Sequence, residues 1–129
     1  LKEEAPIVIV DFHAEATAEK ICFAKYCNSL GVSAVLGTHT HVQTSDEKII
    51  NDYTAYITDA GFCGVYDSVI GMAYESSLKR LVTSLPERFD IAESSVLELN
   101  AVKMAFDPVS GGAKSIERIR FIKDISEVS

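Results

Sequence analysis

The chain has 129 residues, of which 47% are hydrophobic and 24% are charged, a balance typical of a globular domain that excludes a disordered chain. The formal net charge of -7 argues against strong binding to nucleic acid or to an anionic membrane surface. The length predicts a single domain over residues 1–129.

The first part of the chain predicts a strand, a helix and a second strand. The apolar run IVIV (residues 7–10) is rich in β-branched residues and is typical of a strand buried on both faces. Residues 17–30 predict a helix whose apolar stripe is formed by Ala16, Phe23, Cys27 and Leu30. VSAVLG (residues 32–37) predicts a second buried strand. This order indicates a parallel pair joined by a right-handed crossover, and therefore an α/β fold.

The remaining elements follow at regular intervals. A strand is predicted over residues 54–58, a Gly-rich loop over 61–71, and a helix over 74–85 that the following proline ends. The stretches at residues 95–107 and 114–122 flank PVSGG and predict a hairpin at the C-terminal edge.

All three histidines of the chain fall at strand ends in this scheme. His13 follows the first strand, and His39 and His41 follow the second, at the sheet edge where ligand sites of open α/β sheets gather. If residues 39–41 are extended, His39 and His41 point to the same side. Because imidazole is a common ligand for divalent metals, the pattern predicts a metal site, with solvated or hydrogen-bonding histidines as the alternative.

Two carboxylates accompany these histidines. Asp11 and Asp59 each follow a strand, where a carboxylate can fix the tautomer of a histidine ligand, although a loop or turn cap is the favoured explanation for each. The sequence contains no G-x-S-x-G elbow, no Walker A loop and no G-x-G-x-x-G fingerprint. The residues therefore favour metal chemistry over serine catalysis or nucleotide binding by a Gly-rich loop.

The three cysteines lack the spacing of a disulfide framework, which indicates a reduced, cytoplasmic setting. Cys22 and Cys27 lie within the predicted helix, where we expect them to be buried small hydrophobic residues. No apolar run is long enough to cross a membrane, and no signal peptide is evident, so we expect no membrane contact.

Four longer stretches carry a family resemblance: VDFHAEATAEK, SAVLGTHTHVQTSDEKI, AYITDAGFCGVYDSVIGM and SIERI. In this order they resemble the C-terminal half of the bacterial calcineurin-like metallophosphoesterases related to 2′,3′-cyclic-nucleotide 2′-phosphodiesterase. The match extends from Pro6 to Ile122. The superfamily pattern G-H-x-H corresponds here to residues 37–41, with one residue inserted after the glycine.

The resemblance implies half of a two-sheet αββα sandwich with outer helices and a centre of two divalent metal ions. The ions would be iron or manganese, with magnesium or zinc as alternatives. By this resemblance His13 and His39 are ligands of one metal and His41 is a ligand of the other. The implied activity is hydrolysis of 2′,3′-cyclic nucleotides or related phosphodiesters by a metal-activated hydroxide, which acts on a small phosphodiester substrate. A homo-oligomer is a further expectation.

The family's Gly-x-x-Gly-x-Tyr-Asp-Ser pattern is also present. By resemblance it lies near the site, where Tyr66 or Asp67 would touch substrate or the opposite subunit, and a purely structural turn is the alternative. Relatives usually have a Gly- and Pro-rich stretch at the position of KIINDYTAYITDAG, and we expect Asn51 and Asp52 to make a turn there.

The N-terminal half of the family domain is not in this sequence. The chain opens LKEEAPIVIV without an initiator methionine and reaches a core-type strand almost at once, so we expect it to be the inside of a longer protein. The resemblance assigns the bridging carboxylate and the general-acid histidine to that half. We therefore expect the chain alone to be inactive. The alternatives are a non-catalytic scaffold or degenerate paralogue, and a mononuclear three-histidine metalloenzyme.

Overall fold

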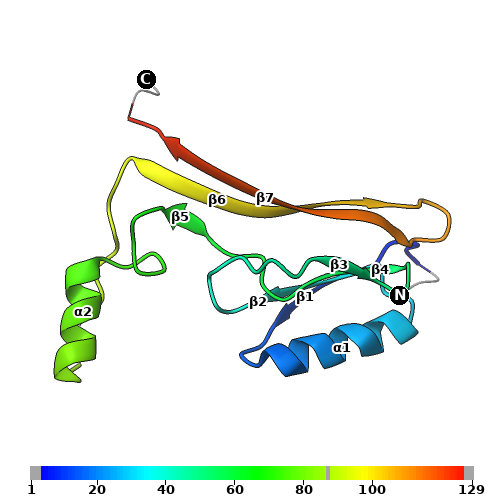
Figure 1. The fold of residues 1–129 in the computed structure, drawn as a ribbon, viewed down its shortest axis with the longest axis horizontal. Coiled ribbons are helices and arrows are strands. Elements are labelled where there is room, and N and C mark those ends of the chain that lie inside the picture. Colours follow the sequence, from blue (N-terminus) through cyan, green and yellow to red (C-terminus); the bar gives the residue numbers. More distant parts are fainter. Residues whose placement is uncertain (1–3, 87, 127–129) are drawn as a thin grey trace. The chain divides into compact units, whose positions relative to one another are not determined.

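The structure is a computed structural model that describes residues 4–86 and 88–126. The described residues divide into two compact units: one contains the chain up to Gly61 together with Asn100–Ile119, and the other contains Phe62–Leu99 and the chain from Arg120. Together they form a mixed α/β structure with two sheets and two helices (Figure 1). The α/β class is therefore confirmed, and the prediction of a single domain stays a prediction.

The first unit contains a four-stranded sheet in the order β1-β2-β4-β3. Its strands are β1 (Ile9–His13), β2 (Ala34–Thr38), β3 (Lys48–Ile50) and β4 (Thr54–Ile57). The pairs β1–β2 and β2–β4 are parallel, and β3 is antiparallel to β4. Helix α1 (Thr17–Ser29) connects β1 to β2 (Figure 1), which confirms the predicted strand–helix–strand unit and its parallel pair.

Strand β1 differs from its prediction. It begins at Ile9, two residues later than expected, and its side chains alternate between exposed and partly buried. The prediction of burial on both faces is therefore wrong, because β1 lies at the edge of the sheet and only one of its faces is covered. β4, by contrast, is buried on both faces, since all four of its residues are buried.

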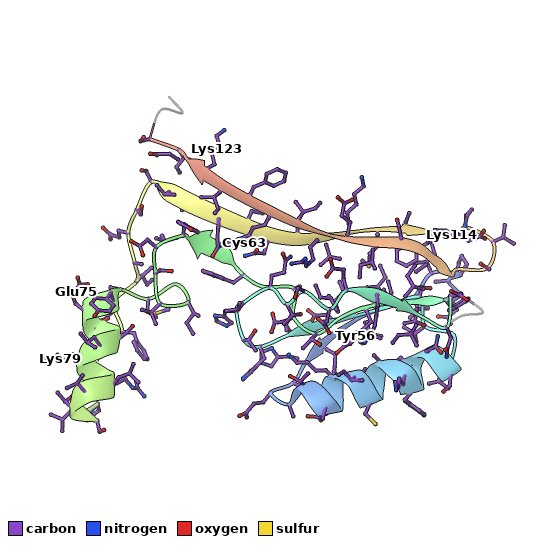
Figure 2. The ribbon with its side chains drawn as sticks, viewed as in Figure 1. Tyr56, Cys63, Glu75, Lys79, Lys114 and Lys123 are labelled. Atoms are coloured by element: carbon purple, nitrogen blue, oxygen red, sulfur yellow. The ribbon has the colours of Figure 1, made fainter. Side chains whose placement is uncertain are left out.

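Helix α1 packs on one face of this sheet. Its buried residues are Lys20, Ala24 and Cys27. Ala24 and Cys27 form a core cluster with Val35 and with Tyr56, which is labelled in Figure 2. The predicted stripe is therefore only partly right, since Ala16 is exposed and Leu30 is 58% exposed. Cys27 is buried as expected, and its burial raises the pKa of its thiol. The same expectation is wrong for Cys22, which is exposed.

The opposite face of the sheet is covered by the tip of a long hairpin. Its strands are β6 (Val96–Phe106) and β7 (Ala113–Asp124), as the sequence predicted. Ala113 forms a second core cluster with Ala34 and Ala55. Because successive side chains of a strand point to opposite faces, these alanines face the hairpin while their neighbours in β2 and β4 face α1.

A tight turn links β3 to β4. Asn51 and Asp52 both have positive φ, at 47° and 53°, and the Tyr53 N–H closes the turn by donating to the Ile50 carbonyl at 3.0 Å. Two consecutive residues with positive φ are typical of the hairpin turns that match strand twist. The expectation of a turn at these two residues is confirmed.

The second unit contains β5 (Cys63–Val65), the remaining part of the hairpin and α2 (Tyr74–Thr83). β5 lies inside the segment that was predicted to be a loop, and it pairs antiparallel with β6. Helix α2 ends at Thr83, and its side chains include the exposed Leu81 and Val82. Neither helix among the described residues is both long enough and apolar enough to span a bilayer.

Gly37 in β2 allows the close approach of two backbone segments. The Ala60 N–H donates to the Gly37 carbonyl at 2.9 Å, and a Cβ at Gly37 would lie 1.8 Å from the Thr58 carbonyl oxygen. We expect Gly37→Ala to lower the free energy of unfolding of the full-length protein by about 1–3 kcal/mol or more, because the obstacle is backbone and cannot rotate away. Chemical denaturation measures this loss.

Gly112→Ala is the matched control for that measurement. A Cβ at Gly112 would lie 3.1 Å from the Tyr53 ring, which is a side chain and can shift by a few tenths of an ångström. We expect a clearly smaller loss for this variant. Equal losses in the two variants would contradict the proposed role of the Gly37–Thr58 contact.

Candidate functional site

Two of the three histidines meet at the C-terminal ends of β1 and β2. His13 is the last residue of β1 and is paired in register with Thr38, the last residue of β2. His39 follows, and its Nδ1 lies 3.2 Å from Nε2 of His13, with the ring centroids 5.1 Å apart and the rings nearly perpendicular. The predicted proximity of His13 and His39 is therefore confirmed, and the parallel pairing is its cause.

The segment that carries His39 and His41 is a bend and not an extended strand. The φ angles are 150° at His39 and 62° at His41, both in the region that favours glycine. The argument that an extended backbone points both imidazoles to one side therefore does not apply. Residues in such conformations are strained, and they persist only where surrounding contacts hold them in place.

His13 is oriented by a short chain of hydrogen bonds. The Thr38 hydroxyl donates to Oδ1 of Asp11 at 3.3 Å, and the Thr38 hydroxyl oxygen lies 3.2 Å from Nδ1 of His13. Because the hydroxyl proton is committed to Asp11, the Thr38 oxygen acts as acceptor and Nδ1 of His13 carries the proton. In that tautomer Nε2 of His13 presents its lone pair toward His39.

Asp59 holds the bend in place through hydrogen bonds. Its carboxylate is 1% exposed, and its Oδ2 accepts the Thr40 N–H at 2.7 Å and the Thr40 hydroxyl at 2.8 Å. Oδ1 accepts the Gly61 N–H at 2.9 Å, and the buried Lys20 ammonium lies 3.5 Å from Oδ2. Burial alone would raise the pKa of the Asp59 carboxyl, but these donors and the Lys20 charge outweigh burial and hold the pKa below its ordinary value.

Asp46 fixes the far end of the same loop. Its Oδ1 accepts the Thr44 hydroxyl at 2.7 Å and the Thr58 N–H at 3.2 Å, and its Oδ2 accepts the Thr58 hydroxyl. Burial would raise the pKa of the Asp46 carboxyl, but the hydrogen bonds from Thr44 and Thr58 outweigh it and lower the pKa. The loop is thereby tied to the residues that follow β4.

The histidine pair has the donor chemistry of a metal site. Two nitrogen ligands at about 2.1 Å from one ion lie roughly 3 Å apart, close to the 3.2 Å between Nε2 of His13 and Nδ1 of His39. Within residues 4–86 and 88–126, no group of three or more His, Cys, Asp or Glu side chains is arranged to hold a metal ion. The described residues therefore fit a metal with two ligands, and the assignment of His13, His39 and His41 to a metal pair stays a prediction.

Tyr66 and Asp67 belong to the second unit. Tyr66 is 45% exposed, and the Arg120 guanidinium lies 5.7 Å from the centre of its ring. Asp67 lines a surface pocket together with Ser68 and Glu75. Their predicted contact with substrate or with an opposite subunit stays a prediction.

Sequence reasoning missed Lys20 and Thr40. Thr40 lies between the two histidines, and its residue type alone does not mark it as a support for them. Lys20 escapes prediction because a lysine is seldom buried without a partner. Its spacing of four and seven residues from Ala24 and Cys27 was the available signal, since these three positions share one face of a helix.

The comparisons with known proteins agree with the sequence resemblance. The chain is 46% identical to 2′,3′-cyclic-nucleotide 2′-phosphodiesterase from Bacillus subtilis over 117 residues, which are 91% of this chain and 44% of that protein. A crystal structure described as a novel phosphatase from Mycoplasma pneumoniae matches with a TM-score of 0.84 and 37% identity, over 92% of this chain and 42% of the other.

A hypothetical protein from Thermus thermophilus matches as well, with a TM-score of 0.84 and 37% identity over 92% of this chain and 45% of the other. The chain thus resembles proteins named as phosphoesterases and spans less than half the length of each of these three proteins. A family model described as YmdB-like protein matches residues 1–119. The chain belongs to this YmdB-like protein family.

The lowered pKa of Asp46 predicts that the stability of the protein depends on pH in a specific way. Because the pKa of Asp46 is lowered in the folded protein, its contribution is fully present above the unfolded value of about 3.9 and is lost as the pH falls through the lower folded value. In Asp46→Asn the free energy of unfolding should therefore fall less steeply than in the wild type as the pH drops below about 4. Denaturant unfolding at a series of pH values measures both slopes.

Asp52→Asn is the control, because it makes the same chemical change in an exposed turn away from the loop that Asp46 fixes. We expect its slope to stay near that of the wild type. If the slope of Asp46→Asn also matches the wild type, the Asp46 contacts do not bear on acid stability.

Proposed function

We propose that the full-length protein is a metal-dependent phosphodiesterase that hydrolyses 2′,3′-cyclic nucleotides or related phosphodiesters. The observation that carries the proposal is the meeting of His13 and His39 at the carboxyl edge of the parallel sheet, 3.2 Å apart through ring nitrogens. The 46% identity to a protein named 2′,3′-cyclic-nucleotide 2′-phosphodiesterase supports the substrate class.

In this proposal His13 and His39 hold one divalent ion and His41 contributes to the site of a second, with iron or manganese as the ions. The hydrogen bonds from His13 through Thr38 to Asp11 support the assignment, because they leave Nε2 of His13 as a lone-pair donor. The chemistry that two such ions would supply when bound is stabilisation of negative charge on the phosphoryl oxygens and a nucleophilic water of lowered pKa.

The residues of this chain do the positioning. Asp11 and Thr38 fix the tautomer of His13, while Asp59 and Asp46 fix the loop that carries His39 and His41. The two imidazoles of His13 and His39 are exposed at the sheet edge, so a phosphodiester can reach them from solvent. The wider architecture that we propose is an αββα sandwich that includes both sheets of this chain, for which the TM-scores of 0.84 are the support.

Metal reconstitution of the full-length protein tests this function. We expect hydrolysis of 2′,3′-cyclic AMP to 3′-AMP in the presence of Mn²⁺ or Fe²⁺, by cleavage of the 2′ ester, and loss of turnover with a chelator. His13→Gln and His39→Gln should each lower kcat/KM by more than roughly 100-fold, since loss of a residue that merely supports a metal ligand costs 10–100-fold. Chromatography of the products and elemental analysis of the protein provide the measurements.

Tyr26→Gln is the control, because it introduces the same side chain on the exposed face of α1. It should leave kcat/KM unchanged. Two ions per full-length chain support the proposal, whereas one ion indicates a mononuclear enzyme and none indicates a non-catalytic scaffold. The isolated 129-residue chain, with only three of the expected ligands, should give no turnover.

A further inference from the structure

Thr40 is one of the residues that fasten the histidine loop, the segment after β2 that carries His39 and His41, to the rest of the first unit. It stands between His39 and His41, whose φ angles of 150° and 62° both lie in the strained region. Its N–H and its hydroxyl both donate to Oδ2 of Asp59, at 2.7 Å and 2.8 Å. The hydroxyl oxygen also accepts the N–H of Val42 at 3.2 Å. One threonine therefore constrains the backbone on both sides of itself.

The acceptor of these hydrogen bonds is held by a buried charge from the helix. The Lys20 and Asp59 side chains are each 1% exposed, and the Lys20 ammonium lies 3.5 Å from Oδ2 of Asp59. The stem of Lys20 reaches this position beside Gly37, where a Cβ would lie 3.1 Å from Cδ of Lys20. A buried carboxylate without an opposite charge tends to become protonated, and it would then lose acceptor capacity toward Thr40.

We propose that Lys20 and Asp59 are positioning residues that act through Thr40 to hold His39 and His41 in the conformation that receives metal. Lys20 balances the charge of the buried Asp59 carboxylate, Asp59 accepts hydrogen bonds from both polar groups of Thr40, and Thr40 holds the strained backbone of its two neighbours. Neither Lys20 nor Asp59 is a metal ligand in this scheme. The three residues come from α1, from the segment after β4 and from the loop after β2.

This inference rests on the proposed metal site, and it predicts an effect that a purely structural ion pair would not produce. A pair that only stabilises the fold would lower the melting temperature when it is altered and leave the metal affinity of the folded protein unchanged. A clamp on the histidine loop would change metal affinity even in a variant that keeps its stability. Thr40→Val separates the two cases, because it removes the hydroxyl and leaves both buried charges in place.

The test is a titration of the metal-free full-length protein with Mn²⁺, with free Mn²⁺ followed by electron paramagnetic resonance. We expect Thr40→Val to raise the Kd for Mn²⁺ by about 10- to 100-fold, as is typical when a group that orients a metal ligand is lost. Thr40→Ser, which keeps the hydroxyl, should restore an affinity near that of the wild type. Thr83→Val is the matched control, because the Thr83 hydroxyl donates to the Lys79 carbonyl and accepts the Leu85 N–H, both at the C-terminal end of α2 in the second unit.

Lys20 is tested by the double variant Lys20→Met with Asp59→Asn. Removing both charges avoids leaving either one unpaired in the interior, so the double variant should fold even if Lys20→Met alone does not. We expect a similar rise in its Kd for Mn²⁺. A readout without metal is the exchange of the residue 40 amide proton by NMR, which should be about tenfold faster once the charged acceptor is gone.

The outcomes are distinct for the clamp and for the proposed function. If the wild type takes up no Mn²⁺, the proposed function fails and the clamp fails with it. If the wild type binds Mn²⁺ and both Thr40→Val and the double variant bind it equally well, the function stands and the clamp is overturned. Weaker binding by both, with rescue in Thr40→Ser and no change in Thr83→Val, establishes the clamp.

Discussion

The histidine loop depends on one buried carboxylate, that of Asp59. An ionised group with 1% exposure is costly in a protein interior unless its oxygens are hydrogen-bonded and its charge is balanced. Both conditions are met, by the N–H groups of Thr40 and Gly61, the Thr40 hydroxyl and the Lys20 ammonium. A buried ion pair adds little net stability over apolar residues of similar size, whereas losing one partner costs about 3–5 kcal/mol. The Lys20–Asp59 pair thus contributes more to the position of Thr40 than to the net stability of the fold.

Parallel pairing explains why residues far apart in the sequence lie at the same edge of the sheet as this carboxylate. β2 lies between β1 and β4 and runs parallel to both, so their C-terminal ends share one edge. His13 ends β1, the loop of His39 begins where β2 ends, and Asp59 follows β4 by two residues. The missing side chain at Gly37 then allows β2 to approach the segment after β4 closely. The order of the strands and the glycine at position 37 therefore bring His13, the loop of His39 and Asp59 to the same edge of the sheet.

The parts of the site that depend on periodicity could be predicted from the sequence. Alternating blocks of strand and helix residues predicted the parallel pair, and that pair brought His13 to His39. The bend at residues 39–41 could not be predicted, because histidine rarely adopts the φ angles seen there and no local pattern signals them. The contacts that impose the bend come from Asp59, a residue of another strand end.

The burial of Lys20 escaped prediction for a related reason, since hydrophobic patterning assigns lysine to the solvent side of a helix. Only the pairing with Asp59, much later in the chain, makes a lysine acceptable in the interior.

The arrangement also determines how much of the positive charge of a metal ion at this edge its ligands would neutralise. His13 and His39 are the converging donors, and a neutral imidazole brings no negative charge to a divalent ion. The nearby carboxylates have other roles, because Asp11 acts on His13 through Thr38 and Asp59 holds Thr40. Since the described residues place no third acidic or histidine side chain with this pair, they would leave the ion's positive charge largely uncompensated. In the proposed function, the part of that charge that other ligands do not neutralise would attract a phosphodiester, which links the histidine edge to phosphoester chemistry.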